Sequence, residues 1–142
     1  MRMLIAALAA LLLGAFQAET ASAASLVAQV SLSSQTMVVK ENGIVKYRWH
    51  VSTGRKGYGT PTGSWKAKWA SRNHRSRKYD NAPMPYAIFF NGGYAVHATF
   101  DTRRLGRPAS HGCVRLHTAN AATFYSLVKK VGMGNTRIVV TN

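Results

Sequence analysis

The sequence has 142 residues, enough for one domain, and it contains no internal repeat or low-complexity tract. The apolar share of 46% is normal for a globular protein and allows one core, while the single cysteine excludes an internal disulfide. Lysine and arginine number 19 against 4 aspartate and glutamate, and this net charge of +15 favours anionic polymers or surfaces as partners without choosing among them.

Residues 1–23 are predicted to be a secretory signal peptide. Met1-Arg2 is a short positive start, residues 3–15 are continuously apolar, and residues 21–23 fit the A-x-A cleavage pattern. The apolar run is too short to span a membrane comfortably, so cleavage is favoured over an anchor. We therefore expect residues 24–142 to be exported as one mature domain.

Alternating apolar and polar residues predict short strands along most of the mature chain. Asn42-Gly43 predicts a tight hairpin turn, because both residues accept a positive φ. In the strand over 45–51 the apolar residues share one face, which we expect to turn inward, and His50 lies on the solvent face. The predicted strands cover residues 26–32, 36–39, 45–51, 65–69, 86–90, 94–98, 114–116 and 137–141.

One helix is predicted after these strands, with Thr118 as its N-cap and Gly132 at its end. Its apolar residues are spaced i, i+3, i+4, i+7, which places Phe124, Leu127, Val128 and Val131 on one face. Many short strands and one helix predict a mostly-β single domain.

Residues 53–63, 70–85 and 99–109 are predicted to be loops. The 70–85 loop is rich in basic residues, namely Arg72, His74, Arg75, Arg77 and Lys78. We interpret it as solvated surface, with contact to an anionic polymer or a substrate carboxylate as the alternative.

The only cysteine, Cys113, lies in the sequence SHGCVR at residues 110–115. The thiolate is the nucleophilic form, and we expect nearby positive charge to lower the thiol pKa from its usual value of about 8.5. Gly112 allows a sharp bend, so the N–H groups of Gly112 and Cys113 are candidate donors to an oxyanion. A buried, inert cysteine is the alternative, but an unpaired cysteine in an exported protein favours a reactive thiol. The positive charges are those of Arg103, Arg104, Arg107 and Arg115.

The SHGCVR sequence, with His97 sixteen residues before the cysteine, resembles the signature of the L,D-transpeptidase catalytic-domain family. The likeness extends to the GTPTG sequence at residues 59–63, to Met84-Pro85-Tyr86 and to residues 89–97. These ordered matches cover nearly all the chain after the leader. The resemblance implies a β-sandwich-like catalytic module with the helix packed on one side.

The resemblance also implies roles for individual residues. Cys113 is expected to be the nucleophile, His97 the general base and acid, and the carbonyl of Ala98 the group that orients the histidine. Ser110 and His111 are expected to shape the site. Arg115 is expected to bind a substrate carboxylate, with a structural ion pair as the alternative.

By the same resemblance, Cys113 attacks a peptidoglycan stem peptide and forms a thioester. A neighbouring stem amine then makes a 3→3 crosslink, a wall-attached protein supplies the amine, or water makes the site an L,D-carboxypeptidase. Location in the periplasm or cell wall is implied, with roles in cell-wall organisation and cell shape. No cofactor and no nucleic acid are implied.

Two further hypotheses come from other residue patterns. His97, His111, Cys113 and His117 are zinc ligands by type, although ligands two residues apart on one strand face the same way and strain a tetrahedron. The net charge also suits a non-enzymatic binder of nucleic acid or an anionic wall polymer, although no nucleic-acid motif is present.

Overall fold

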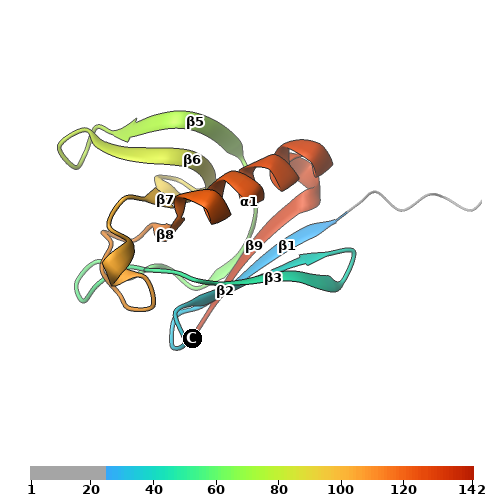
Figure 1. The fold of residues 1–142 in the computed structure, drawn as a ribbon, viewed down its shortest axis with the longest axis horizontal. Coiled ribbons are helices and arrows are strands. Elements are labelled where there is room, and N and C mark those ends of the chain that lie inside the picture. The colour runs from blue at the N-terminus through green and yellow to red at the C-terminus, as the bar shows by residue number, and fades with distance from the viewer. Residues whose placement is uncertain (1–24) are drawn as a thin grey trace, which may run out of the picture.

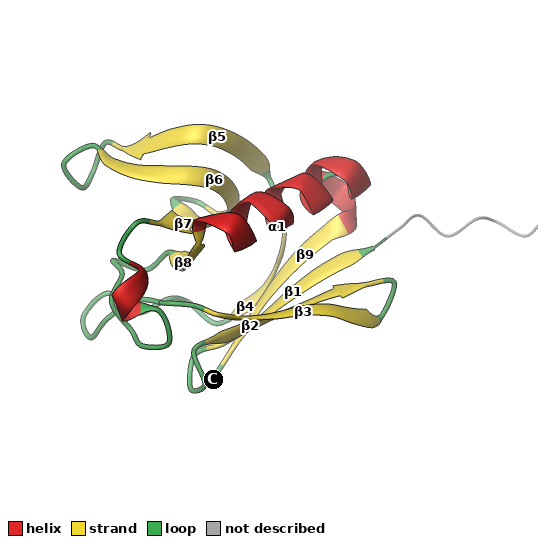
Figure 2. Ribbon diagram, viewed as in Figure 1, coloured by secondary structure: helices red, strands yellow, loops and turns green. Residues whose placement is uncertain are grey.

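The structure of the protein is a computed structural model, and it describes residues 25–142. The predicted signal peptide lies outside the described residues. Within them, two β-sheets and one α-helix enclose a single main core, which confirms the prediction of a mostly-β, sandwich-like domain (Figures 1 and 2). No helix of residues 25–142 is long and apolar enough to cross a membrane.

The first sheet has five strands in the order β3-β2-β1-β9-β4. At its centre β1 lies parallel to β9, so the beginning and the end of the described chain run side by side (Figure 1). The predicted turn between β2 and β3 is present, and Asn42 and Gly43 both have positive φ, 51° and 79°. The strands are β1 (Leu26–Ser31), β2 (Thr36–Glu41), β3 (Ile44–His50), β4 (Gly63–Lys66) and β9 (Thr136–Thr141).

The second sheet has four strands in the order β5-β6-β7-β8. Its antiparallel hairpins are followed by one parallel pair, in which His97 of β7 lies in register with Arg115 of β8. The connection between these two strands contains the short 3₁₀ helix η1 (Thr102–Arg104). The strands are β5 (Trp69–Ser76), β6 (Ala82–Asn91), β7 (Tyr94–Thr99) and β8 (Val114–His117).

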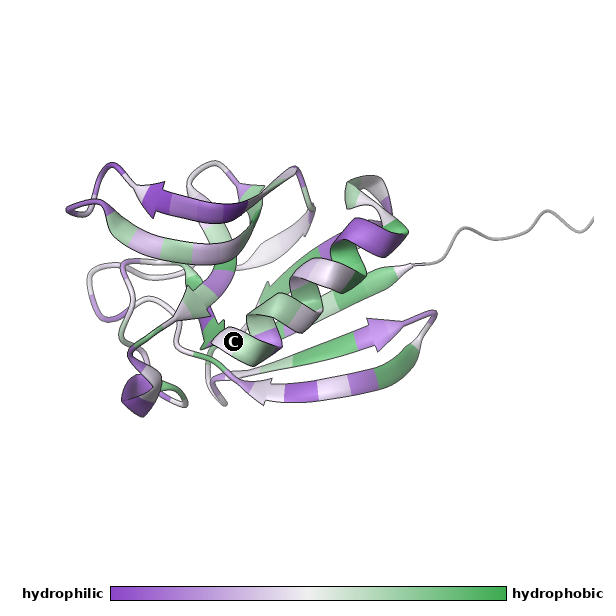
Figure 3. Cartoon of the chain, turned by 45° about the horizontal axis from the view of Figure 1, so that its top comes forward, coloured by the Kyte–Doolittle hydropathy of each residue, from purple (hydrophilic) through white to green (hydrophobic). Residues whose placement is uncertain are grey.

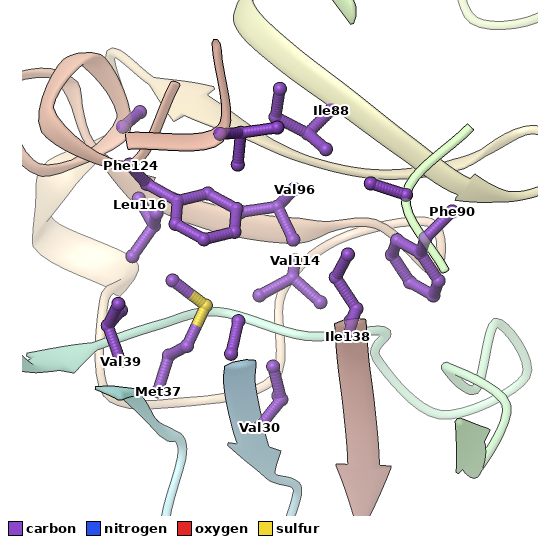
Figure 4. Close-up of a cluster of buried hydrophobic side chains, with 14 of the residues drawn as sticks. Val30, Met37, Val39, Ile88, Phe90, Val96, Val114, Leu116, Phe124 and Ile138 are labelled. Carbon is purple, nitrogen blue, oxygen red and sulfur yellow. The ribbon is translucent and has the colours of Figure 1, made fainter. Parts of the chain in front are cut away.

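Helix α1 (Thr118–Val131) packs its apolar face into the core. The ring of Phe124 lies between Val96 and Leu116 of the second sheet and Met37 of the first (Figure 4). Truncation of a buried phenylalanine to alanine typically costs about 3–5 kcal/mol of stability. The helix therefore joins the two sheets and fixes β7 and β8 relative to the rest of the domain.

Helix α1 begins differently from the prediction. The N-cap is His117, not Thr118, and its Nδ1 accepts a hydrogen bond of 3.2 Å from the N–H of Ala119. The end is as predicted, because Gly132 has a φ of 95° and follows the last helical residue. The remaining helical turn is η2 (Met133–Asn135).

The strand predicted over residues 65–69 is wrong. Residues 63–66 belong to β4 in the first sheet, and Trp69 begins β5 in the second. Between them the N–H of Ala67 bonds to Thr136 and that of Lys68 bonds to Phe89, so the chain crosses from one sheet to the other. The alternation of apolar and polar residues continues through this crossing, so the sequence pattern cannot reveal where the chain leaves the first sheet.

The loop predicted over residues 70–85 is also wrong, because these residues form most of the β5–β6 hairpin. Asp80 and Asn81 have positive φ, 52° and 53°, and make the turn. β5 is an edge strand and is largely hydrophilic (Figure 3), so it lacks the apolar alternation that marks a half-buried strand. Pro83 and Pro85, which pair with β5, also argued against a strand in the sequence.

The inner face predicted for β3 is only partly buried. Val45 is 42% exposed and Tyr47 is 39% exposed, because β3 is the edge strand of its sheet. Tyr47 and Trp49 stack on each other with ring centroids 4.8 Å apart. Val51 lies beyond the end of the strand and is fully buried.

Candidate active site

A cavity of ≈ 550 Å³ opens on the face of the second sheet that points away from helix α1. Alternation along the strands creates this face: Val96 and Ala98 point into the main core, and His97 between them points into the cavity. The cavity is also lined by Cys113, which directly precedes β8, and by Arg115, the second residue of β8. The fold thus brings together residues that are far apart in the sequence.

His97 is buried, with 5% of its surface exposed. Its Nδ1 lies 2.7 Å from the carbonyl oxygen of Ala98, and a carbonyl can only accept, so the hydrogen lies on Nδ1 and Nε2 keeps its lone pair. Burial lowers the pKa of His97 from 6.5 to about 4, with smaller lowering by Arg115 and His74, against a raising effect of the Ala98 hydrogen bond. The imidazole is therefore neutral at pH 7 and can accept a proton.

Cys113 is half-buried at the wall of the cavity, and its thiol lies 3.7 Å from the carbonyl oxygen of Gly93. Burial raises the pKa of this thiol, and this effect outweighs the lowering by a backbone hydrogen bond from Ala95 and by the charge of Arg115. The prediction of a lowered thiol pKa is wrong. Desolvation outweighs charge here, and of the four arginines only Arg115 is among the causes of the shift in this pKa.

Arg115 has no ion pair with any residue in the range 25–142, where the salt bridges join Arg104 to Asp101 and Lys130 to Glu41. The backbone of Arg115 is fixed, because its N–H and carbonyl both bond to Ser52, at 2.8 and 3.0 Å. Its side chain lines the cavity without a paired carboxylate from the described residues. This arrangement favours binding of a substrate carboxylate over the structural ion pair.

The turn before the cysteine is held by hydrogen bonds. The hydroxyl of Ser110 donates to the carbonyl of Cys113 at 2.6 Å and accepts from the N–H of Gly112 at 3.0 Å. Thr60 donates to the carbonyl of Gly112 at 2.7 Å. Of the two predicted oxyanion donors, the N–H of Gly112 is therefore already engaged, which leaves the N–H of Cys113.

Gly112 is required by its conformation. Its φ is 125°, a region that L side chains rarely adopt, and an added Cβ would lie 2.5 Å from Cε1 of Tyr94. Tyr94 itself lines the cavity beside the cysteine. The glycine thus permits both the sharp turn and the close approach of the aromatic ring.

His111 shapes the site through aromatic contacts. Its ring stacks on Tyr79 with centroids 4.0 Å apart and an interplanar angle of 7°, and it meets the edge of Tyr58 at 4.9 Å. Tyr79 lies in the turn between β5 and β6, so this contact ties the tip of that hairpin to the segment that carries Cys113. The sequence predicted that His111 shapes the site but did not indicate Tyr79.

His74 is a second cavity residue from the β5–β6 hairpin, and the sequence indicated it only as one of the basic residues of the 70–85 segment. It lies on β5, lines the cavity, and contacts the ring of Phe89 edge-on at 4.9 Å. Its charge acts on His97, so the two imidazoles are close enough to interact. Within a segment predicted to be a loop, no signal separated this position from its basic neighbours. Asp80-Asn81 is the one sequence signal for the turn of this hairpin. It is a weak signal unless the two strands that it joins are also recognised.

The zinc hypothesis is not supported by the arrangement of its ligands. In residues 25–142 there is no group of three or more histidine, cysteine, aspartate or glutamate side chains that could hold a metal ion. His117 caps helix α1, and His111 stacks against Tyr79. The four residues proposed as ligands therefore do not form a common site.

Fold and cavity together define the class of protein: a mostly-β domain in which a cysteine thiol and a neutral histidine share one cavity. The family profile of YkuD, the L,D-transpeptidase catalytic domain, matches residues 25–140, and the chain belongs to this family. This confirms the resemblance found in the sequence. No curated protein matches the chain.

Solved structures of L,D-transpeptidases are similar to this chain. The enzyme from Stackebrandtia nassauensis is 30% identical with a TM-score of 0.74, over 83% of this chain and 56% of that one. The enzyme from Xylanimonas cellulosilytica is 28% identical with a TM-score of 0.69, over 85% and 62%. LdtMt1, solved in complex with imipenem, is 25% identical with a TM-score of 0.74, over 83% and 59%. This chain therefore spans less than two thirds of the length of these structures.

Proposed function

We propose that the protein is an exported L,D-transpeptidase that acts on peptidoglycan stem peptides through a thioester on Cys113 and forms 3→3 crosslinks. One observation carries this proposal: Cys113 and His97 open on the same cavity, and the carbonyl of Ala98 fixes the hydrogen of His97 on Nδ1. Membership of the L,D-transpeptidase catalytic-domain family supports the substrate class and the reaction.

In the first step the thiol of Cys113 gives its proton to Nε2 of His97 as sulfur bonds to the carbonyl carbon that links an L-centre to a D-centre. The N–H of Cys113 donates to the oxyanion, a contact commonly worth about 10²–10³ in rate. The carbon–nitrogen bond then breaks, and His97 returns the proton to the nitrogen of the departing D-amino acid. Arg115 binds a carboxylate of the stem.

In the second step an acceptor amine attacks the thioester. The new carbon–nitrogen bond replaces the carbon–sulfur bond, and the proton lost by the amine passes through His97 back to sulfur. An amine from a second stem gives a 3→3 crosslink, and an amine of a wall-attached protein gives a protein–wall linkage. Water in the same position gives a carboxypeptidase.

Incubation of the purified protein with disaccharide-tetrapeptide, followed by mass spectrometry of the products, tests the proposal. A crosslinked dimer is the expected product. A trimmed stem alone assigns the carboxypeptidase reaction, and an unchanged substrate favours a non-catalytic basic binder of the wall. Cys113→Ala is the matched control, and product formed by this variant would reject Cys113 as the nucleophile.

Export is part of the proposal and rests on the sequence of residues 1–23. Secretion of the protein from its host, followed by N-terminal sequencing of the recovered chain, tests it. Ala24 is the expected first residue of the mature protein. A recovered chain that starts at Met1 would contradict cleavage.

A further inference from the structure

A second hollow, of ≈ 650 Å³, lies directly beside the catalytic cavity. Its walls are formed by the segment that follows β7 and contains η1. Phe100 and Asp101 line both hollows, so the two adjoin at these residues. A molecule bound in the second hollow therefore lies next to the cavity that holds Cys113.

The backbone around this hollow is tied to a neighbouring segment. The N–H of Gly106 donates to the carbonyl of Val51 at 2.8 Å, and the hydroxyl of Ser52 donates to the carbonyl of Arg104 at 2.5 Å. Farther along, the N–H of Ala109 donates to the carbonyl of Thr53 at 2.9 Å. The side chains of the hollow are thus presented from a fixed backbone, and less ordering is needed when a ligand binds.

Charge and exposure in the hollow fit an anionic ligand. Arg104 is paired with Asp101 at 3.0 Å, whereas Arg103 and Arg107 form no ion pair within residues 25–142. A guanidinium is always charged and matches a carboxylate through two parallel hydrogen bonds. Beside these groups Phe100 is 69% exposed, and its ring offers apolar contact area at the boundary with the catalytic cavity.

A single exposed arginine is ordinary solvated surface, but this arrangement differs in two respects. Arg103 and Arg107, neither of which forms an ion pair within residues 25–142, gather with an exposed aromatic ring on one short, tied segment. That segment borders the cavity that holds the cysteine, where the second substrate of a transferase must arrive. Charge complementarity therefore indicates an acidic peptide as the occupant.

We propose that Arg103, Arg107 and Phe100 form the binding site for the acceptor, a peptide that carries carboxylates and a free amine. This inference rests on the proposed function and names the site of its second substrate. The arginines bind the acceptor's carboxylates, and its amine nitrogen lies in the catalytic cavity. That nitrogen bonds to the thioester carbonyl as the carbon–sulfur bond breaks, and its proton returns to sulfur through His97.

A two-stage assay of the full-length protein tests the proposal. The donor is a disaccharide-tetrapeptide with its side-chain amine acetylated, so that it forms the thioester but cannot act as acceptor. The acceptor is a stem tripeptide with a free side-chain amine and free carboxylates. In the Arg103→Gln/Arg107→Gln variant we expect the KM for this acceptor to rise about tenfold, and the rate of thioester formation to change far less.

The double variant Lys66→Gln/Lys129→Gln removes the same net charge from exposed positions outside both hollows, and its KM is expected to match that of the unchanged protein. An acceptor with its carboxylates converted to amides is expected to bind both proteins equally. Three results would overturn the proposal: an unchanged KM in the arginine variant, an equal rise in the lysine variant, or a rise that persists with the amidated acceptor.

Failure of the proposed function gives a different result, because the unchanged protein would then form no thioester with the donor. Titration calorimetry of the tripeptide still tests the hollow in that case. Weaker binding by the arginine variant, but not by the lysine variant, supports a site for acidic peptides. Equal affinities overturn it, as does weaker binding of a polyphosphate probe with unchanged binding of the tripeptide.

Discussion

Nδ1 of His97 lies 2.7 Å from the carbonyl oxygen of Ala98, its own neighbour in β7. The orienting group of the candidate base is therefore a backbone atom, and no third side chain is needed to fix the tautomer. A backbone carbonyl survives any substitution of its side chain. The two residues of this contact should thus respond very differently to mutation.

His97→Gln is expected to slow thioester formation by about 10²–10⁴-fold, because general base catalysis is lost. Ala98→Gly keeps the carbonyl and is expected to retain most of the rate, with a stability loss of about 1 kcal/mol for glycine within a strand. Stopped-flow measurement of thioester formation separates the two variants. A loss of rate in Ala98→Gly as large as in His97→Gln would contradict the role of the carbonyl.

Stability is expected to fall in acid because of His97. Burial lowers its pKa from 6.5 in the unfolded chain to about 4 in the folded protein, so the unfolded chain binds this proton more tightly. The contribution is full above pH 6.5 and is lost as the pH falls through about 4. Its size is on the order of 3 kcal/mol. Urea unfolding at several pH values measures it, and His97→Gln should remove this part of the pH dependence.

The thiol of Cys113 is expected to titrate above its ordinary pKa, because burial disfavours the thiolate. The ultraviolet absorbance of the thiolate, followed against pH, gives the midpoint. Arg115→Gln should raise the midpoint further, since the charge of Arg115 favours the thiolate. A midpoint below the ordinary value in the unchanged protein would show that charge outweighs desolvation after all.

A carbapenem is expected to acylate Cys113, because a thiol that shares a cavity with a neutral histidine can attack the carbonyl of a strained lactam. Intact-protein mass spectrometry should show the addition of one drug molecule. Cys113→Ala should show none, and His97→Gln should react more slowly. An adduct that persists in Cys113→Ala would place the acylated residue elsewhere.

Gly112→Ala is expected to destabilise the protein and to abolish activity. The φ of 125° strains any side chain, at about 1–2 kcal/mol, and the new Cβ would meet Cε1 of Tyr94 at 2.5 Å. Gly134→Ala is the matched control, because nothing beyond its chain neighbours lies within 4 Å of the position that a Cβ would occupy. Thermal unfolding and thioester formation should separate the two variants, and equal behaviour would contradict the need for glycine at residue 112.

Much of the fold was predictable because its signals are local. The hairpin at Asn42-Gly43 and the helix that ends at Gly132 follow from the backbone preferences of a few adjacent residues. The β5–β6 hairpin was missed because it lacks such local signals. An exposed edge strand carries no apolar alternation, and its pairing partner lies across a turn that the sequence marks only weakly.

The sequence by itself identified the family, the candidate nucleophile Cys113 and the candidate base His97. It could do so because residue types and their spacing can be read directly from the chain. Only the tertiary structure decided which way the thiol pKa moves, and which basic residues border the cavity. Desolvation depends on how many atoms from distant segments surround a group. Cys113 packs against Met84, Phe89 and Ala95, and these neighbours from distant segments surround the sulfur only in the folded chain.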